Sequence, residues 1–319
     1  MKLFVTGGAG FIGSNYVRHI INNTDDHVTV FDALTYAGNR LNLSDLEGNS
    51  RFSFIVGDVC DRASVETSLP GHDAVIHFAA ESHVDRSIND PDAFIRTNCD
   101  GTNVLCDVAR KFDIQKFVHV STDEVYGSIE EGSFTEDDPL SPRSPYSASK
   151  AGSDLIANSY YITHGLPLVT TRSSNNYGPY QFPEKIIPLF ITNLLDEIEV
   201  PIYGDGQNIR DWCHVVDNCR GIDLVLREGE IGEIYNLGGG NEITNLELTK
   251  TIFDLMGCNE SMITWVEDRL GHDRRYSIDT SKASALGWSP TQSFEDGIAD
   301  TVRWYRENRS WWEPLKARI

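Results

Sequence analysis

The stretch KLFVTGGAGFIGSN, residues 2–15, passes from an apolar run through a glycine-rich turn into an amphipathic segment. Gly7, Gly10 and Gly13 recur at intervals of three. In a strand–turn–helix unit, one glycine makes the turn, one lets the backbone approach a pyrophosphate, and one lets the helix pack on the strand. Glycine spacing alone is weak evidence, but a strand before it and a helix after it are the required context. The stretch therefore predicts a dinucleotide-binding fold.

An acidic residue at the end of the next apolar run strengthens this interpretation. Asp32 follows the glycine loop by about 20 residues, where an acid hydrogen-bonds the adenine ribose and repels a 2′-phosphate. The position favours NAD over NADP. The alternative is a structural glycine turn with an incidental Asp. Asp58, after the third apolar run, is a candidate for the adenine edge, and Asp61 suits a helix N-cap.

Apolar runs alternate with helical segments through the first half of the chain. The predicted strands cover 2–6, 27–31, 53–57, 74–78, 117–121 and 168–172, and the predicted helices cover 13–21, 62–68, 101–111 and 146–164. The runs are rich in Val, Ile and Phe and unbroken, as strands buried on both faces should be. This alternation predicts an α/β fold with a doubly wound parallel sheet of the Rossmann type.

The pattern becomes less regular after about residue 179. Residues 212–226 and 233–240 resemble a helix and a strand that rejoin the sheet, and the tail carries helical stretches at 245–256 and 294–307. We expect a smaller C-terminal α/β domain that binds the substrate. The expected division is a cofactor domain over 1–178, with 213–240 returning to it, and a substrate domain over 179–212 and 241–319.

The amino-acid composition disfavours several classes of binding partner. The chain has 319 residues and a formal net charge of −21, which disfavours nucleic acid and anionic lipid because both require clustered Lys and Arg. No apolar run reaches the ~20 residues of a membrane span, and the apolar start is too short for a signal peptide. Six scattered cysteines, without close metal-type pairs, are expected to be reduced thiols. We expect a cytoplasmic protein without a metal site.

Tyr146 and Lys150 lie four residues apart in YSASK, which places both side chains on one face of a helix. A phenol with a pKa near 10 is a poor base at neutral pH. A nearby ammonium and the positive nicotinamide of NAD would lower that pKa, so that Tyr146 could take a proton from a substrate hydroxyl. Such pairs also occur by chance on many helices.

The apolar run at 117–121 ends in Ser121 and Thr122 and leads directly into Asp123 and Glu124. Adjacent residues on a regular strand point to opposite faces, so the chain must turn after Thr122 if both acids are to reach one substrate. Two carboxyls held close cannot both ionise easily, which leaves one neutral acid and one charged base. The alternative is that both acids cap a helix or face water.

These motifs together resemble the extended short-chain dehydrogenase/reductases over almost the whole length. Within that family, further stretches resemble the dTDP-glucose 4,6-dehydratases, whose members act on a nucleotide sugar. These stretches are FDALTYAGN, AAESHVDRSI, STDEVYG, SSNNYGPYQFPEKIIPL, PIYGDGQNIRDW and GHDRRYSID. The resemblance implies a NAD-dependent hydro-lyase that oxidises C4 of glucose, eliminates water across C5 and C6, and returns hydride to C6. NAD would stay tightly bound and be regenerated in each turnover.

The resemblance also implies roles for individual residues. Tyr146 and Lys150 would serve the hydride step, and Thr122 would hydrogen-bond the C4 oxygen. Asp123 would be the general acid at C6 and Glu124 the base at C5. Cofactor contacts would come from Gly7, Gly10, Phe11, Ile12, Gly13, Asp32, Leu34, Thr35, Asp58, Val59, Phe78, Ala79, Ala80, Ser82, Thr97, Tyr146, Lys150 and Asn176. Substrate contacts would come from Ser82, Thr122, Asn175, Asn176, Lys185, Ile186, Ile187, Pro201, Tyr203, Arg210, Asn245, Arg269, His272 and Tyr276.

Some questions stay open at this level. A 4-epimerase or decarboxylase of the same fold would keep Tyr146 and Lys150 but would have little use for the two acids. A non-catalytic NAD-sensing protein would keep only the glycine loop. Leu270 and Gly240 stand where the family often has proline and histidine, which leaves the pathway undetermined. The preference for thymine and a homodimer formed through the helices at 101–111 and 146–164 follow from the resemblance alone.

Overall fold

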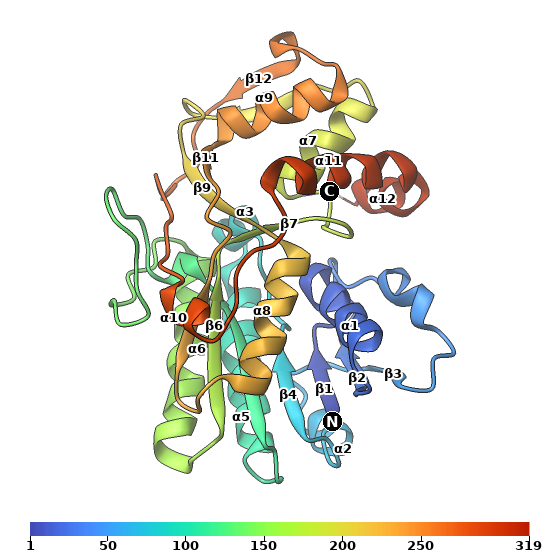
Figure 1. Ribbon diagram of the computed structural model, residues 1–319, viewed down its shortest axis with the longest axis vertical. Coiled ribbons are helices and arrows are strands. Elements are labelled where there is room, and N and C mark those ends of the chain that lie inside the picture. The colour runs from blue at the N-terminus through green and yellow to red at the C-terminus, as the bar shows by residue number, and fades with distance from the viewer. Residues whose placement is uncertain (319) are drawn as a thin grey trace.

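In the computed structural model, which describes residues 1–318, a large parallel sheet lies between two helical layers, and a smaller unit covers one end of it (Figure 1). The sheet has the strand order β10-β6-β5-β4-β1-β2-β3, and every adjacent pair is parallel. Its strands are β1 (Lys2–Thr6), β2 (His27–Asp32), β3 (Phe52–Val56), β4 (Ala74–His77), β5 (Lys116–Thr122), β6 (Leu168–Ser173) and β10 (Ile234–Leu237). The predicted doubly wound α/β fold is confirmed.

Alternate residues of β1 explain the unbroken apolar runs. Leu3 and Val5 belong to one hydrophobic core, and Phe4 belongs to another on the opposite face of the sheet. The first core is covered by α1 (Phe11–Asn23) and α8 (Val215–Glu228), and the second by α2 (Arg62–Ser68), α5 (Gly101–Ala109) and α6 (Pro145–His164). The strand order reverses between β1 and β4, and the carboxyl ends of the strands at such a point form a ligand crevice.

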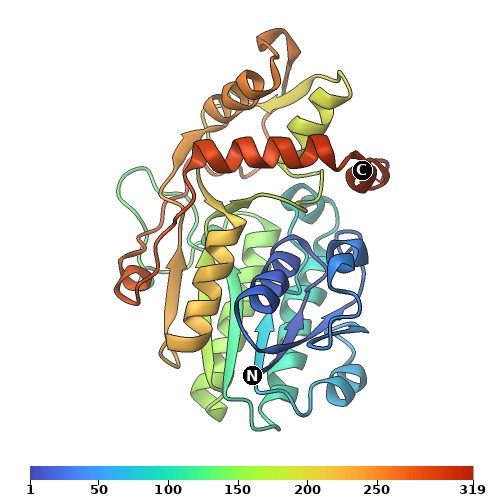
Figure 2. The same ribbon diagram turned by 45° about the vertical axis from the view of Figure 1, so that its right-hand side comes forward.

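The smaller unit lies beyond the carboxyl ends of the strands (Figures 1 and 2). It contains β7 (Asn175–Tyr177), α7 (Ile186–Leu195), β8 (Val200–Tyr203), β9 (Ile209–His214), β11 (Glu242–Thr244), α9 (Asn245–Met256), β12 (Ile263–Val266), α11 (Phe294–Glu307) and α12 (Arg309–Lys316). The helices α7, α9 and α11 share one hydrophobic core, with α11 lying across the larger unit in Figure 2. The stretch 212–226 is divided between the end of β9 and α8, because β9 extends to His214.

Short elements that the sequence pattern did not predict complete the chain. They are η1 (Arg40–Leu46), α3 (Val84–Asn89), α4 (Pro91–Phe94), η2 (Ile95–Asp100), η3 (Asp123–Val125), η4 (Glu260–Met262) and α10 (Ser281–Ala285). Ala283 of α10 and the following Trp288 pack into the core of the larger sheet, although they come from the C-terminal part of the chain. Within residues 1–318, no helix combines the length and the apolar character that crossing a bilayer requires.

Candidate active site

The glycine loop after β1 is packed so closely that side chains would not fit. Gly7 has a φ of +70°, and a Cβ there would lie 2.5 Å from the backbone nitrogen of Ala79. A Cβ on Gly13 would lie 2.3 Å from the carbonyl oxygen of Gly7. The loop thus brings bare backbone to the opening between β1 and β4, as a phosphate cradle at the start of α1 requires.

Asp32, at the end of β2, braces this loop. One carboxylate oxygen accepts the N–H of Ala9 at 2.9 Å, and the other accepts the N–H of Leu34 at 2.8 Å. Burial raises the pKa of Asp32, and these two N–H groups oppose the rise. Leu34 has a φ of +52°, an uncommon conformation for a residue with a side chain. Asp32 therefore fixes both the glycine loop and the turn that follows it.

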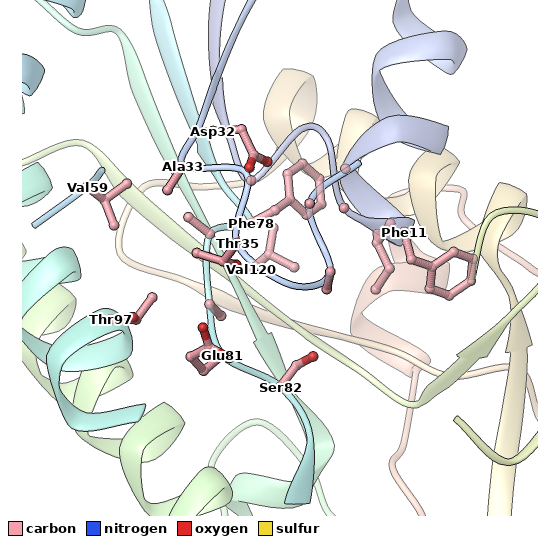
Figure 3. A pocket seen from close by; sticks show the side chains of 18 of the residues that line it. Phe11, Asp32, Ala33, Thr35, Val59, Phe78, Glu81, Ser82, Thr97 and Val120 are labelled. Atoms are coloured by element: carbon pink, nitrogen blue, oxygen red, sulfur yellow. The ribbon is translucent and has the colours of Figure 1, made fainter. Parts of the chain in front are cut away.

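A cavity of about 250 Å³, here called the cofactor cavity, opens above the glycine loop (Figure 3). In that view Asp32, Phe78 and Val120 project from strand ends around the opening. Sixteen of the eighteen predicted cofactor residues line it; Leu34 and Asn176 do not. The sixteen are Gly7, Gly10, Phe11, Ile12, Gly13, Asp32, Thr35, Asp58, Val59, Phe78, Ala79, Ala80, Ser82, Thr97, Tyr146 and Lys150.

The chemistry of this cavity fits a dinucleotide. Ser121 Oγ and Gln181 Oε1 are buried and have no hydrogen-bond partner among residues 1–318, and both residues line the cavity. A bound ligand with donor and acceptor groups would satisfy these atoms. The glycine cradle suits a pyrophosphate, and the acid at the end of β2 suits a ribose without a 2′-phosphate.

The chain does turn after Thr122. Thr122 is extended, with φ −137° and ψ 152°, and caps the short helix η3 in which Asp123 and Glu124 form the first turn. Its hydroxyl accepts the N–H of Glu124 at 3.3 Å and donates to Asp123 Oδ1 at 3.1 Å. The two acids therefore follow a helical arrangement. On a regular strand adjacent side chains would point to opposite faces, and this turn avoids that arrangement.

The two acids occupy different environments. Asp123 is 2% exposed, and its Oδ2 has no hydrogen-bond partner in the described part of the chain. Burial, and then the charge of Glu124, raise the pKa of Asp123 well above its usual value. Burial also raises the pKa of Glu124, but the charges of Arg269 and Lys185 oppose that rise. Asp123 is thus the better proton donor of the pair and Glu124 the better base.

Tyr146 and Lys150 lie in the first turns of α6, which begins with a reciprocal capping box between Ser144 and Ser147. Lys150 Nζ donates to the carbonyl oxygen of Val120 at 2.8 Å, so the lysine is tied to the strand that ends in Thr122. Burial, followed by the charge of Glu124, raises the pKa of Tyr146 above its ordinary value. Lowering that pKa therefore requires more positive charge than Lys150 supplies by itself.

A second cavity, of about 550 Å³, lies between the two units and is here called the substrate cavity. It is lined by five Lys or Arg and three Asp or Glu, whereas the whole chain has 27 against 48. This local reversal of charge suits a small anionic ligand. The predicted substrate residues that line it are Asn175, Lys185, Ile186, Pro201, Tyr203, Arg210, Asn245, Arg269, His272 and Tyr276.

The remaining predicted substrate residues lie elsewhere. Ser82 lines the cofactor cavity, whereas Thr122 and Asn176 line neither cavity. Ile187 is fully buried in the core of the smaller unit. Asn176 Nδ2 donates to the carbonyl oxygen of Ser174 at 2.9 Å.

The basic residues of the loop before α10 separate into two groups. Arg269 faces the substrate cavity, and its Nε is buried without a partner among the described residues. Arg274 and Arg275 line neither cavity and form ion pairs with Asp205 and Glu242. Arg210 lies over the ring of Tyr276, with its Cζ 4.2 Å from the ring centroid. Arg210 and Arg269 are thus the arginines of this region best placed for a diphosphate.

The two cavities lie next to each other. Glu184 and Lys185 line both of them. Tyr146 faces the cofactor cavity and Glu124 the substrate cavity, and the charge of Glu124 acts on the pKa of Tyr146. A ligand in the substrate cavity can therefore meet Glu124 close to Tyr146, whereas the buried Asp123 lines neither cavity.

Comparison with known proteins shows which family the chain belongs to. A family profile described as GDP-mannose 4,6 dehydratase matches residues 4–301. The dTDP-glucose 4,6-dehydratase of an Actinoplanes species is 56% identical, over 98% of this chain and 100% of the relative. The chain belongs to the dTDP-glucose 4,6-dehydratase family. The family member from Streptomyces niveus is 53% identical, over 99% of this chain and 96% of its own.

Solved structures of the dTDP-glucose 4,6-dehydratases share the fold. DesIV from Streptomyces venezuelae, crystallised with NAD bound, matches with a TM-score of 0.97 and 55% identity. The match covers 99% of this chain and 100% of DesIV. The resemblance stated from the sequence motifs is therefore confirmed at the level of the family and of the fold.

Several cavity residues were not predicted from the sequence. The cofactor cavity is also lined by Glu81, Arg96, Ser121, Gln181, Phe182 and Glu184, and the substrate cavity by His83, Asp85, Arg86, Trp212 and Arg318 among others. Most of these residues come from loops and short helices, where no periodicity identifies the face that meets a ligand. The sequence does offer a reason to expect Ser121 in the site, because it precedes Thr122 at the end of a strand. His83 caps α3 and also lines the substrate cavity.

Proposed function

We propose that this chain is a dTDP-glucose 4,6-dehydratase, a hydro-lyase that converts dTDP-glucose into dTDP-4-keto-6-deoxy-glucose. The observation that carries the proposal is the turn after Thr122, which brings Asp123 and Glu124 close enough to Tyr146 for their charges to act on its pKa. Tyr146 lines the cofactor cavity and Glu124 the substrate cavity, whereas the buried Asp123 lines neither. An enzyme that only moves hydride would need Tyr146 and Lys150 but not this pair of acids. The family membership and the NAD-bound relative support the same conclusion.

The residues of the cofactor cavity would hold NAD, with the glycine loop under its pyrophosphate and Asp32 near its adenine ribose. When bound, NAD supplies a nicotinamide that accepts a hydride from C4 of the sugar and gives one back at C6. Tyr146 takes the proton of the C4 hydroxyl, Thr122 hydrogen-bonds the C4 oxygen, and the ammonium of Lys150 stabilises the phenolate.

Asp123 and Glu124 carry out the elimination of water. A ketone at C4 acidifies the hydrogen at C5, and Glu124 removes it as the general base. Asp123, whose buried carboxyl keeps its proton, donates to the C6 hydroxyl as it leaves as water. Glu124 then returns a proton to C5. Glu124 therefore takes a proton from C5 and gives one back, whereas Asp123 loses one proton in each cycle, and the proton that Tyr146 takes from the C4 hydroxyl balances this loss.

The nucleotide part of the substrate would occupy the substrate cavity. Arg210, Arg269 and Lys185 supply positive charge for the diphosphate, and guanidinium groups suit phosphate because they donate two hydrogen bonds in one plane. We propose the division expected from the sequence, with a cofactor domain over 1–178 to which 213–240 returns, and a nucleotide-sugar domain over 179–212 and 241–319.

We also propose that the protein is a homodimer that pairs through α5 and α6. Leu155 and Ile162 of α6 are 61% and 72% exposed, which is unusual for large apolar residues on one helix. Leu155→Arg should shift the mass in light scattering from dimer to monomer. Leu41→Arg is the matched control, since Leu41 is also 61% exposed but lies in η1. The cytoplasmic location expected from the sequence stays a prediction.

The function is tested by incubating the purified protein with dTDP-glucose and analysing the products by mass spectrometry and NMR. We expect a product that has lost one water and carries a keto group at C4. A 4-epimerase, the principal alternative, would instead give a product of unchanged mass. Parallel incubations with UDP-glucose and GDP-mannose test the base preference, and turnover of either one in place of dTDP-glucose would indicate another nucleotide-sugar 4,6-dehydratase.

A further inference from the structure

Three segments meet at the rim of the cofactor cavity. They are the loop after β2, which carries Tyr36, the helix α3, which carries Arg86, and the loop between β7 and α7, which carries Phe182 and Glu184. The first two belong to the larger unit, and the third leads into the smaller unit. We call these four side chains the clasp.

Arg86 connects the other members of the clasp. Its Nε donates to Glu184 Oε2 at 2.8 Å, and its Cζ lies 4.0 Å from the centroid of the Tyr36 ring. Phe182 meets the same ring edge-on, with the two centroids 5.5 Å apart and an interplanar angle of 85°. The guanidinium is therefore held by an ion pair on one side and by an aromatic face on the other.

Glu184 gives the clasp its stability. Its side chain is only 4% exposed, and Arg86 is its ion-pair partner among the described residues. A buried carboxylate that loses its partner is strongly disfavoured, so the pair resists opening. Burial, followed by the charge of Glu184, raises the pKa of Tyr36, so its phenol stays protonated.

The clasp joins segments that line the cofactor cavity. Thr35, Ala37 and Gly38, on both sides of Tyr36, line the cofactor cavity, as do Phe182 and Glu184. Tyr36 itself lines neither cavity, and Arg86 lines only the substrate cavity. Tyr36 and Arg86 thus join the walls of the cofactor cavity from outside it.

We propose that the clasp of Tyr36, Arg86, Phe182 and Glu184 retains the dinucleotide between the two hydride transfers. This inference rests on the proposed function, because a hydride taken from C4 must be returned at C6 within one catalytic cycle. A dehydrogenase that exchanges its cofactor in every turnover would be slowed by such a closure. An enzyme that regenerates its own NAD gains from it.

The test measures the dissociation rate of NADH from the purified protein without sugar, by the decay of nicotinamide fluorescence after excess NAD is added. Arg86→Met and Tyr36→Leu should each release NADH about ten-fold faster or more, the effect expected for a lost hydrogen bond to a charged group or a lost cation–π contact. Tyr36→Phe keeps the ring under Arg86 and removes only the hydroxyl that interacts with Glu184, so it should release NADH more slowly than Tyr36→Leu. Wild-type rates for both Arg86→Met and Tyr36→Leu would overturn the proposal.

Two controls separate retention from folding and from the proposed function. Arg274→Met breaks an exposed ion pair with Asp205 that lines neither cavity, and should leave NADH release unchanged. Urea unfolding of each cofactor-free variant identifies any general loss of stability. If Arg86→Met unfolds, the double variant Arg86→Met with Glu184→Gln removes the unpaired carboxylate, and slow release from that folded protein would refute the proposal. Product analysis of the wild type tests the dehydratase function separately.

Discussion

The hydroxyl of Thr122 donates a hydrogen bond to Asp123 Oδ1 at 3.1 Å, so the residue that ends β5 also orients the acid that follows it. The same oxygen accepts the N–H of Glu124, and a hydrogen bond with Thr122 opposes the rise of the Tyr146 pKa. One hydroxyl has a single proton, so Thr122 can donate either to Asp123 Oδ1 or to an ionised Tyr146, while a lone pair accepts the N–H of Glu124. Thr122 therefore connects Tyr146, which is proposed for the hydride step, with the two acids proposed for the elimination.

Substitutions of Asp123 and Glu124 should slow different steps of the reaction. Asp123→Asn should slow elimination by about 10²–10⁴-fold while C4 oxidation continues, because only the C6 leaving group loses its proton donor. Glu124→Gln should slow elimination to a similar degree and also stop exchange of the C5 hydrogen with solvent. Single-turnover absorbance of reduced nicotinamide follows oxidation, and NMR in D₂O follows exchange. Normal turnover by either variant would refute its assigned role.

Parts of this site could be predicted from the sequence and parts could not, for physical reasons. Gly7, Gly10, Gly13 and Asp32 could be predicted because the dinucleotide-binding motif sets their spacing along one strand–turn–helix–strand unit. The sequence shows that the chain must turn after Thr122 if both acids are to reach one substrate. It does not show that the chain does turn there, because a sequence pattern does not locate the end of a strand to within one residue. Tyr36 and Glu184 could not be assigned at all, since they come together only through the tertiary arrangement of two loops and the helix α3.

The buried acid should cost the protein stability at neutral pH. The pKa of Asp123 is raised in the folded state, so between its unfolded and folded pKa values the folded protein binds more protons, and stability falls as the pH rises through that window. Asp123→Asn cannot ionise and should be more stable than the wild type above the window, with a flatter dependence on pH. Urea unfolding at a series of pH values measures this difference.

Asp154 provides a control of opposite sign for that experiment. Burial acts to raise its pKa, but the hydrogen bond from His119 and the charge of Arg172 prevail and lower it to about 2. Its stabilising effect is therefore present above the unfolded pKa and lost as the pH falls through the folded value. Asp154→Asn should destabilise the protein at neutral pH. A loss of stability in Asp123→Asn as well would contradict the assignment of Asp123 as a buried acid with a raised pKa.

The glycine loop allows a test that separates packing from ligand approach. In Gly13→Ala the new Cβ would lie 2.3 Å from the Gly7 carbonyl oxygen, and in Gly10→Ala it would lie 3.3 Å from the same atom. Gly13→Ala should lower the unfolding free energy of the cofactor-free protein by about 1–3 kcal/mol, the usual cost of overpacking, and Gly10→Ala by less. Both variants should bind NAD more weakly in calorimetry. Equal stability of the two variants would contradict the close contact at Gly13.

Arg269 and Arg274 lie close together in the sequence, yet only Arg269 faces the substrate cavity. Arg269→Ala removes a positive group beside the place proposed for the diphosphate, and a charge-assisted hydrogen bond contributes about 1.5–3 kcal/mol. We expect KM for dTDP-glucose to rise by about ten-fold or more. Its removal also takes away a charge that opposes the raised pKa of Glu124, so the acidic limb of the pH–rate profile should move to higher pH.

Arg274→Ala is the matched control for this prediction. Arg274 pairs with Asp205 at 2.8 Å on the surface, and exposed pairs of this kind contribute about 0–1 kcal/mol to stability. KM and the pH–rate profile should stay at their wild-type values in this variant. Steady-state kinetics with dTDP-glucose across pH compare the two substitutions directly. Equal increases in KM would mean that the two arginines act through general surface charge, and that the substrate cavity does not distinguish them.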